Sequence, residues 1–293
     1  MTHVFLGLAV AAALSFALPL DRAQAQVSQD GTTMTEAVSA ERIRALVDLM
    51  QVDKMLDVMR QEGLDYGKTL NDDMMGGSAG ADWQAKLEGV YDVDALRSGI
   101  EATMLRVYSE EPSMLGDVEE FFGSALGQKI LNLEVEARRA MLDDATKDAA
   151  ELASQQMMGD NDPRMDLLRR FAEVNDLLEM NVAGAMTSNL AFYKGLASEG
   201  AFGNELTEDQ MLSDVWNQEP QVRGDSEKWL FTFMTLAYQP LTDADVEAYI
   251  AFSESPAGQQ LNAAVFAAFD ETFRQVSFEL GRAAAQQMQG NDI

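Results

Sequence analysis

The sequence is poor in the residues that enzymes most often use for chemistry. It contains no Cys, and its single His is His3. Without thiols the chain forms no disulfides, thiolate nucleophiles or Cys-ligated metal sites. Because His3 falls in a predicted signal segment, Ser-His-Asp triads and His-ligated zinc or copper sites are excluded from the mature protein as well. We therefore predict no metal, no cofactor and no catalytic residues, and any enzymatic chemistry would rely on carboxylates, Lys, Tyr or Ser.

Positive charge is also scarce. The chain has 21 Lys and Arg against 49 Asp and Glu, which gives a formal net charge of −28. Such a charge opposes binding to nucleic acids and to anionic lipids, because both are polyanions. We therefore expect no nucleic-acid partner, and we interpret the excess of carboxylates as a solvated acidic surface.

Long apolar runs are confined to the first residues. Residues 4–18 form a short apolar run that ends before Pro19, and an A-x-A sequence follows at Ala23 to Ala25. This layout predicts a secretory signal peptide over residues 1–25, with cleavage between Ala25 and Gln26; an uncleaved anchor is the alternative. No later segment reaches the roughly 20 apolar residues that span a membrane. We expect a periplasmic or secreted protein without an integral membrane segment after cleavage.

The remaining pattern is helical, since sustained alternating strand patterns are almost absent. Apolar residues recur at helical spacing at Phe266, Phe269, Phe273, Val276 and Leu280. The corresponding stripe in the first half of the chain is smaller and more polar: Val135, Arg138, Leu142, Ala145 and Ala149.

The two halves of the sequence resemble each other in order. The matched positions are Leu46 with Leu168, Val52 with Val174, Leu56 with Leu178, Pro112 with Pro240, and Met157 with Met288. This ordered series predicts duplication of a unit of about 125 residues, a common domain size. We place a disordered N-terminus at residues 26–35, the first domain at 36–158, a linker at 159–163 and the second domain at 164–293. The expected fold is all-α, with two tandem duplicated helical-bundle domains packed together and no significant β-sheet.

One segment of the second half resembles a known family. The stretch "LTDADVEAYIAFSESPAGQQL" is similar to the signature of the domain of unknown function 2059 family (DUF2059), and the resemblance covers about residues 225–288. The residues that match are Phe252, Ser255, Pro256, Gly258 and Gln259, and the first half retains Gly127, Gln128 and Lys129 without the Pro. Gln260 stands where the family usually has Lys, and Ser253 where it often has Tyr. The resemblance implies a small exported helical domain and no particular activity.

The shared Gly-Gln motif has two interpretations. Ser255 can cap a helix that begins at Pro256, which would make the motif a joint between two helices. Gly258 would then allow a close approach of neighbouring backbone. The alternative is a ligand or partner contact made by Gln128 and Gln259.

Two further residue sets have a structural and a functional interpretation. The stripe of Phe266, Phe269 and Phe273 belongs either to the bundle core or to a hydrophobic groove for an acyl chain or partner helix. Residues 71–82 and 197–210 are predicted flexible loops, and Met74 and Met75 would lie on the first. Exposed thioethers can bind Cu(I), although Met is more often a filler of hydrophobic cores.

These observations favour an exported helical protein that acts without catalysis, by protein binding or envelope maintenance. A carrier of a small hydrophobic molecule is the first alternative, and the partner would then be that molecule rather than a protein. A carboxylate-only hydrolase is the second alternative. Adjacent pairs such as Asp143 and Asp144 argue against it, because neighbouring residues on a helix point in different directions. The oligomeric state stays open.

Overall fold

The computed structural model describes residues 38–290 except 78, 111 and 203–206. The predicted signal peptide and the polar segment 26–35 lie outside this range. All regular secondary structure in the described residues is helical, which confirms the predicted all-α class. None of the helices described is long and apolar enough to cross a membrane.

The first half of the chain forms a series of helices joined by short turns. They are α1 (Ala40–Leu49), α2 (Val52–Met75), α3 (Ala81–Val90), α4 (Val93–Glu110), the 3₁₀ turn η1 (Pro112–Met114), α5 (Leu115–Gly123), α6 (Ala125–Ala140) and α7 (Asp144–Gly159). The helices of the second half are α8 (Pro163–Val174), α9 (Leu177–Ser198), α10 (Glu208–Trp216), α11 (Glu219–Tyr238), α12 (Asp243–Glu254) and α13 (Pro256–Gly290). Helix α8 begins at Pro163, the last residue of the predicted linker, and the Asp162 side chain accepts a hydrogen bond from the Arg164 amide at 2.8 Å.

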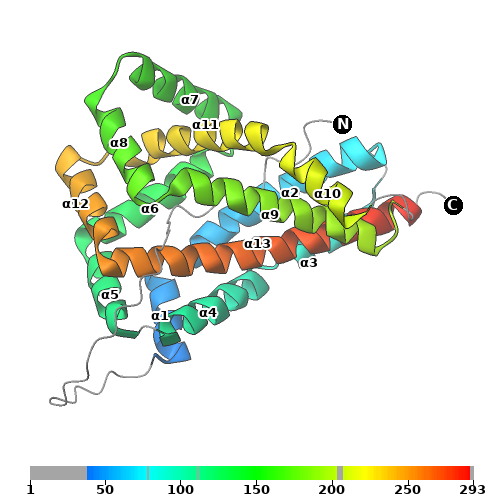
Figure 1. Ribbon diagram of the computed structural model, residues 1–293, viewed down its shortest axis with the longest axis horizontal. Coiled ribbons are helices and arrows are strands. Elements are labelled where there is room, and N and C mark those ends of the chain that lie inside the picture. The colour runs from blue at the N-terminus through cyan, green and yellow to red at the C-terminus, as the bar shows by residue number, and fades with distance from the viewer. Residues whose placement is uncertain (1–37, 78, 111, 203–206, 291–293) are drawn as a thin grey trace.

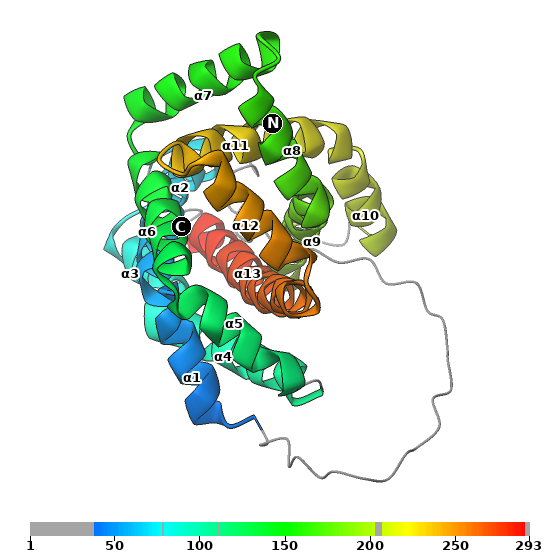
Figure 2. The ribbon, with the colours of Figure 1, turned by 90° about the vertical axis from the view of Figure 1, so that its left-hand side faces the viewer.

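Helix α13 runs through the middle of the structure (Figure 1). It packs along α9 on one side and against α3 and α4 on another. Figure 2 shows it with α1, α4 and α5 on one side and α8, α9 and α12 on the other. One hydrophobic core extends from Ile43 to Ala285 and includes side chains from both halves. The two halves of the chain therefore share a core.

The contact between α9 and α13 is unusually close because each helix presents a glycine to the other. A Cβ atom on Gly281 would overlap the carbonyl oxygen of Phe192, and one on Gly195 would overlap the carbonyl oxygen of Phe278. Both glycines thus allow backbone to approach backbone at this crossing.

Each half begins with a helix pair broken by a residue in the left-handed conformation. Gln51, with φ of 57°, lies between α1 and α2, and Asp176, with φ of 47°, lies between α8 and α9. Val52 and Val174, which the sequence pairs with each other, do not hold equivalent places in these helix pairs. Val52 begins α2, whereas Val174 ends α8.

Two other local predictions are wrong. The flexible loop predicted at residues 71–82 is shorter, because α2 continues to Met75 and α3 begins at Ala81. The apolar stripe that begins at Val135 does not continue along one helix, since α6 ends at Ala140 and α7 begins at Asp144. Leu142 lies in this break and is 38% exposed. Figure 1 shows that α7 then runs beside α11, against which it packs.

Candidate binding pocket between α3, α4 and α13

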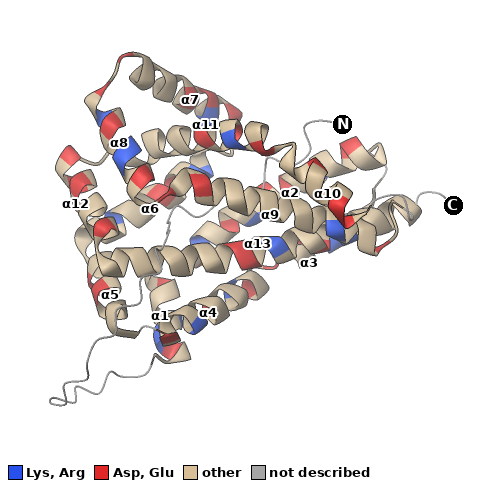
Figure 3. Cartoon of the chain, in the orientation of Figure 1, with Lys and Arg blue, Asp and Glu red and all other residues tan. Residues whose placement is uncertain are grey.

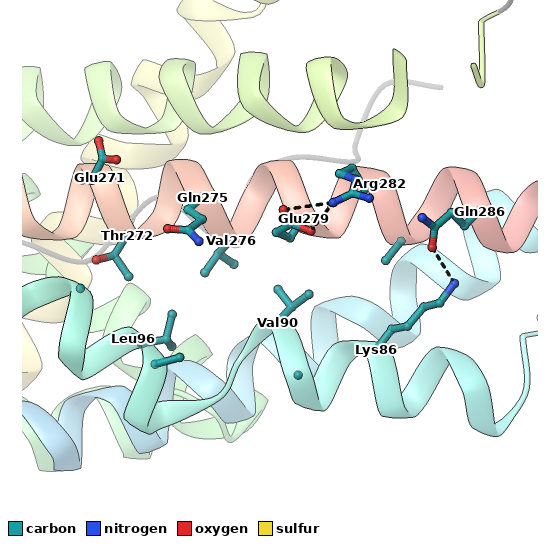
Figure 4. A pocket seen from close by; sticks show the side chains of 14 residues that line it. Lys86, Val90, Leu96, Glu271, Thr272, Gln275, Val276, Glu279, Arg282 and Gln286 are labelled. Carbon is teal, nitrogen blue, oxygen red and sulfur yellow. Dashed lines mark hydrogen bonds and ion pairs between the residues drawn. The ribbon is translucent and has the colours of Figure 1, made fainter. Parts of the chain in front are cut away.

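A pocket of about 370 Å³ lies where the α3–α4 junction faces α13. Its buried floor is formed by four residues from α4 and α13: Leu96, Thr272, Val276 and Ala283. Its rim carries polar and charged side chains: Lys86, Glu271, Gln275, Glu279, Arg282 and Gln286. Figure 4 shows these side chains spread along α13, with Lys86 opposite Gln286 at one end.

The pocket exists because α3 and α4 present small residues to α13. Gly89, Ala95 and Gly99 all belong to its lining. A Cβ atom on Gly89 would meet no heavy atom within 4 Å, and one on Gly99 would lie 3.5 Å from Thr272 Oγ1. Larger side chains at these positions would occupy the space between the helices.

The end of the pocket near Lys86 is a polar network that connects three helices. Lys86 Nζ donates a hydrogen bond to Gln286 Oε1 at 3.1 Å. Arg282 pairs with Glu199 of the segment after α9 at 2.8 Å and with Glu279 at 3.1 Å. The Arg282 hydrogen bond is the main reason that the pKa of the Glu199 carboxyl is lowered. The network therefore favours the ionised form of Glu199 at neutral pH.

The opposite end contains a second ion pair. Arg274 Nη2 lies 2.6 Å from both carboxylate oxygens of Glu271, and this contact lowers the pKa of Glu271. The buried Thr272 hydroxyl donates to the Ala268 carbonyl oxygen at 2.7 Å. Both carboxylates of the rim, Glu271 and Glu279, thus have an arginine partner.

The rim carboxylates are engaged in ion pairs rather than free to transfer protons. A general acid or base needs a pKa near the working pH, whereas a carboxylate paired with Arg stays ionised. In the part of the chain that the structure describes, no group of three or more His, Cys, Asp or Glu residues could hold a metal ion.

A second polar cluster joins the two halves of the molecule at α6, α11 and α12. Glu134 Oε1 accepts hydrogen bonds from Tyr238 Oη at 2.7 Å and from Tyr249 Oη at 3.4 Å. Glu134 as a residue is half-buried, but its carboxyl group lies against two buried tyrosines. Burial raises the pKa of Glu134 to about 7, although the two phenols act in the opposite direction.

The Gly-Gln motif lies at two helix joints. The Ser255 Oγ accepts from the Gly258 amide at 3.1 Å, and the Ser124 Oγ accepts from the Gly127 amide at 3.0 Å. Phe252 and Pro256 lie on either side of the second joint, in α12 and α13. A Cβ atom on Gly127 or Gly258 would overlap the backbone of the preceding helix. The α5–α6 turn therefore requires glycine at position 127, and the α12–α13 turn requires glycine at position 258.

Gln128 and Lys129 contact other elements. Gln128 Nε2 donates to the carbonyl oxygens of Phe122 at 2.7 Å and Leu49 at 3.0 Å, and Gln128 Oε1 accepts from Gln51 at 3.0 Å. Gln128 therefore supports the left-handed turn at Gln51. Lys129 forms an ion pair with Asp245 of the other half at 3.2 Å. Gln259 is half-buried, and its backbone amide donates to the Ser255 carbonyl at 2.9 Å.

The aromatic stripe of α13 lies in the core. Phe266, Phe269 and Phe273 are all buried, and the rings of Phe269 and Phe273 have centroids 6.0 Å apart. None of the three lines the pocket beside α3 and α4. Met74 and Met75 are in the last turn of α2 rather than on a loop, and Met75 is buried.

Comparison of the chain with protein-family models, with curated proteins and with solved structures found no match.

Proposed function

We propose that this chain is an exported, non-enzymatic binding protein whose ligand site is the pocket between α3, α4 and α13. The observation that carries the proposal is the combination of an apolar floor with a charged rim whose carboxylates are already paired. Ligand sites typically join apolar walls to a few polar groups that orient the ligand. The signal-like first residues and the resemblance to the DUF2059 signature support export.

The proposal is closest to the first alternative, a carrier of a small molecule, but places the ligand at a different site from the Phe stripe, and the hydrolase alternative has less support. A hydrophobic carrier with the Phe266, Phe269 and Phe273 wall would need these rings around a cavity, and they are buried in the core. A carboxylate-only hydrolase would need two converging acids in one cleft. The pocket acids Glu271 and Glu279 are eight positions apart on one helix, and each is paired with Arg.

We further propose that the two halves arose by duplication of one helical unit. Arg97 of α4 pairs with Asp53 of α2 at 2.5 Å, and Arg223 of α11 pairs with Glu179 of α9 at 2.5 Å. Both pairs join residues 44 positions apart. The helix order and the serine-capped joints support the same proposal. The shared core indicates that the copies no longer form separate units.

The ligand proposal is tested by native mass spectrometry of the mature protein purified from its own envelope. The pocket-filling variant Gly99→Leu is compared with Gly224→Leu, because a Cβ on the exposed Gly224 of α11 meets no atom within 4 Å. We expect a bound small molecule in the wild type and in Gly224→Leu but not in Gly99→Leu. A stoichiometric protein partner that is retained by both variants would contradict the pocket as the binding site. So would a ligand-free wild-type monomer.

A further inference from the structure

We propose that the pocket takes a small monocarboxylate with an apolar body, whose carboxylate binds Lys86 and whose body covers Leu96 and Val276. This inference rests on the proposed binding function and adds the chemical class of the ligand.

The charge of the ligand follows from the pairing of the lining residues. The pocket has four charged side chains, namely Lys86, Arg282, Glu271 and Glu279. Arg282 pairs with Glu199 and Glu279, and Glu271 pairs with Arg274. Lys86 differs from them, because its hydrogen bond is to the neutral amide of Gln286. It also helps to lower the pKa of Glu199, but Arg282 is the main partner of that carboxylate.

An ammonium group has three donors, so the contact with Gln286 leaves Lys86 able to bind an anion. Figure 4 shows the Lys86 side chain extended from α3 toward α13 at one end of the pocket. Lys86 is half-buried, which weakens the competition from water relative to a fully exposed lysine. A ligand anion at this end would therefore complete the polar network.

The acidic surroundings of the pocket favour a ligand with one negative charge over a ligand with two. The chain carries a net charge of −28, and two carboxylates share the rim of the pocket. Figure 3 shows that acidic residues occur along most of the helices. A phosphate-like dianion would meet one lysine against this field, whereas known phosphate sites use several donors. A carboxylate matches a single ammonium group more closely.

The apolar part of the ligand follows from the aliphatic residues that line the pocket. Val90, Leu96, Val276 and Ala283 provide aliphatic surface between the charged ends. The volume of about 370 Å³ lies at the lower end of the range of about 300–1,000 Å³ found for small-molecule pockets. A short aliphatic or aromatic body fits this space.

The test uses three probes that share an eight-carbon alkyl chain and differ in their head group, namely octanoate, octylamine and 1-octanol. Each is titrated into the full mature protein, and binding is measured by calorimetry. We expect octanoate to bind most tightly and octylamine least. Lys86→Gln should weaken octanoate binding about tenfold, the effect of losing one charged hydrogen bond, and leave 1-octanol unchanged. Gly99→Leu should weaken binding of octanoate and 1-octanol, whereas Gly224→Leu should change neither. Circular dichroism checks that each variant keeps its helical content.

Two results would overturn the inference while the binding function stands. One is octylamine or 1-octanol binding as tightly as octanoate. The other is octanoate binding that Lys86→Gln leaves unchanged while Gly99→Leu still blocks it. If no probe binds the wild type, the inference fails as well. If probes bind but Gly99→Leu affects none of them, the pocket is not the site and the proposed function fails with the inference.

Discussion

The rings of Phe121 and Phe252 are stacked face to face, with centroids 4.0 Å apart and 10° between their planes. Phe121 belongs to α5 and Phe252 to α12. Each phenylalanine lies three positions before the serine that caps the next helix. The Ser124 Oγ donates a hydrogen bond to the Phe121 carbonyl oxygen, and the Ser255 Oγ donates one to the Phe252 carbonyl oxygen, both at 2.6 Å. Two residues in the same place of the two halves therefore contact each other directly.

This stacked pair should contribute to stability as a unit. In a double-mutant cycle with Phe121→Ala and Phe252→Ala, we expect a coupling free energy of about 1 kcal/mol, as found for aromatic pairs in contact. Urea denaturation of the four proteins provides the measurement. Additive single effects would show that each ring stabilises only its own half.

The Glu134 carboxyl should give the protein a measurable pH dependence. Its pKa rises from 4.5 to about 7 on folding, so the folded state holds a proton that the unfolded state has lost between these values. The free energy of unfolding therefore falls as pH rises from about 4.5 to about 7. Glu134→Gln keeps an acceptor for Tyr238 and removes this titration. The wild type should match the variant below pH 4.5 and be less stable above pH 7, by up to about 3 kcal/mol.

The difference between the two proteins is the informative quantity here. Carboxyls such as Asp65, Glu179 and Glu271 have lowered pKa values and act in the opposite direction, but they cancel in the comparison. Chemical denaturation at pH 4, 5.5 and 8 measures the difference. A constant difference across this range would contradict a raised pKa at Glu134.

The crossing of α9 and α13 should not tolerate a methyl group. Gly281→Ala would force the new Cβ onto the Phe192 carbonyl, so we expect a loss of roughly 1–3 kcal/mol. Gly184→Ala in α9 is the matched control, because a Cβ there meets no atom within 4 Å. That change should stabilise the helix by about 0.5–1 kcal/mol. Thermal unfolding of both variants shows whether the signs differ as expected.

Arg138, which the sequence identified only as a polar residue in an apolar stripe, is a buried side chain that forms an ion pair with the partly exposed Glu62. Its side chain is 7% exposed, lies 2.6 Å from Glu62, and is centred 5.7 Å above the Trp229 ring. Arg138→Met leaves the partly exposed Glu62 carboxylate without its partner and should cost about 1–3 kcal/mol. The exposed neighbour Arg139, paired with Glu136, is the control, and Arg139→Met should cost less than about 1 kcal/mol.

A second substitution shows how much of the stability lost in Arg138→Met comes from the unpaired Glu62 charge and how much from the lost packing of the arginine side chain. Adding Glu62→Gln to Arg138→Met removes the uncompensated charge and should restore part of the lost stability. Equal stability of the single and double variants would assign the whole effect to the lost packing of the arginine side chain.

Local signals in the sequence predicted several elements of the fold correctly. Ser255 caps α13 and Pro256 begins it, because capping residues and proline act within a few positions of themselves. The left-handed residue Gln51 carries no such signal, since glutamine, unlike glycine, asparagine or aspartate, rarely adopts this conformation. The conformation of Gln51 is supported by its contact with Gln128, which lies 77 positions away.

The candidate sites were harder to predict for the same reason. Glu134 meets Tyr238 and Tyr249 across 104 and 115 positions, and nothing in its own neighbourhood distinguishes it from other helical glutamates. The pocket arises from the absence of a side chain at Gly99, and that absence leaves a space only once α13 packs beside α4. A pattern of side chains along one segment does not contain that information.

The place of α13 in the chain has a consequence for the order of folding. The helices that pack on it, α2 to α5, α9 and α12, all precede it, and Lys86 is joined to Gln286 across 200 positions. A ribosome or a translocation channel releases the chain from its N-terminal side, so these helices emerge before the one that fills the space between them. Contacts this distant in sequence also slow folding. The apolar faces of α4 and α9 consequently stay exposed until α13 has emerged and folded against them. During that interval the chain is prone to aggregate unless a chaperone binds these faces.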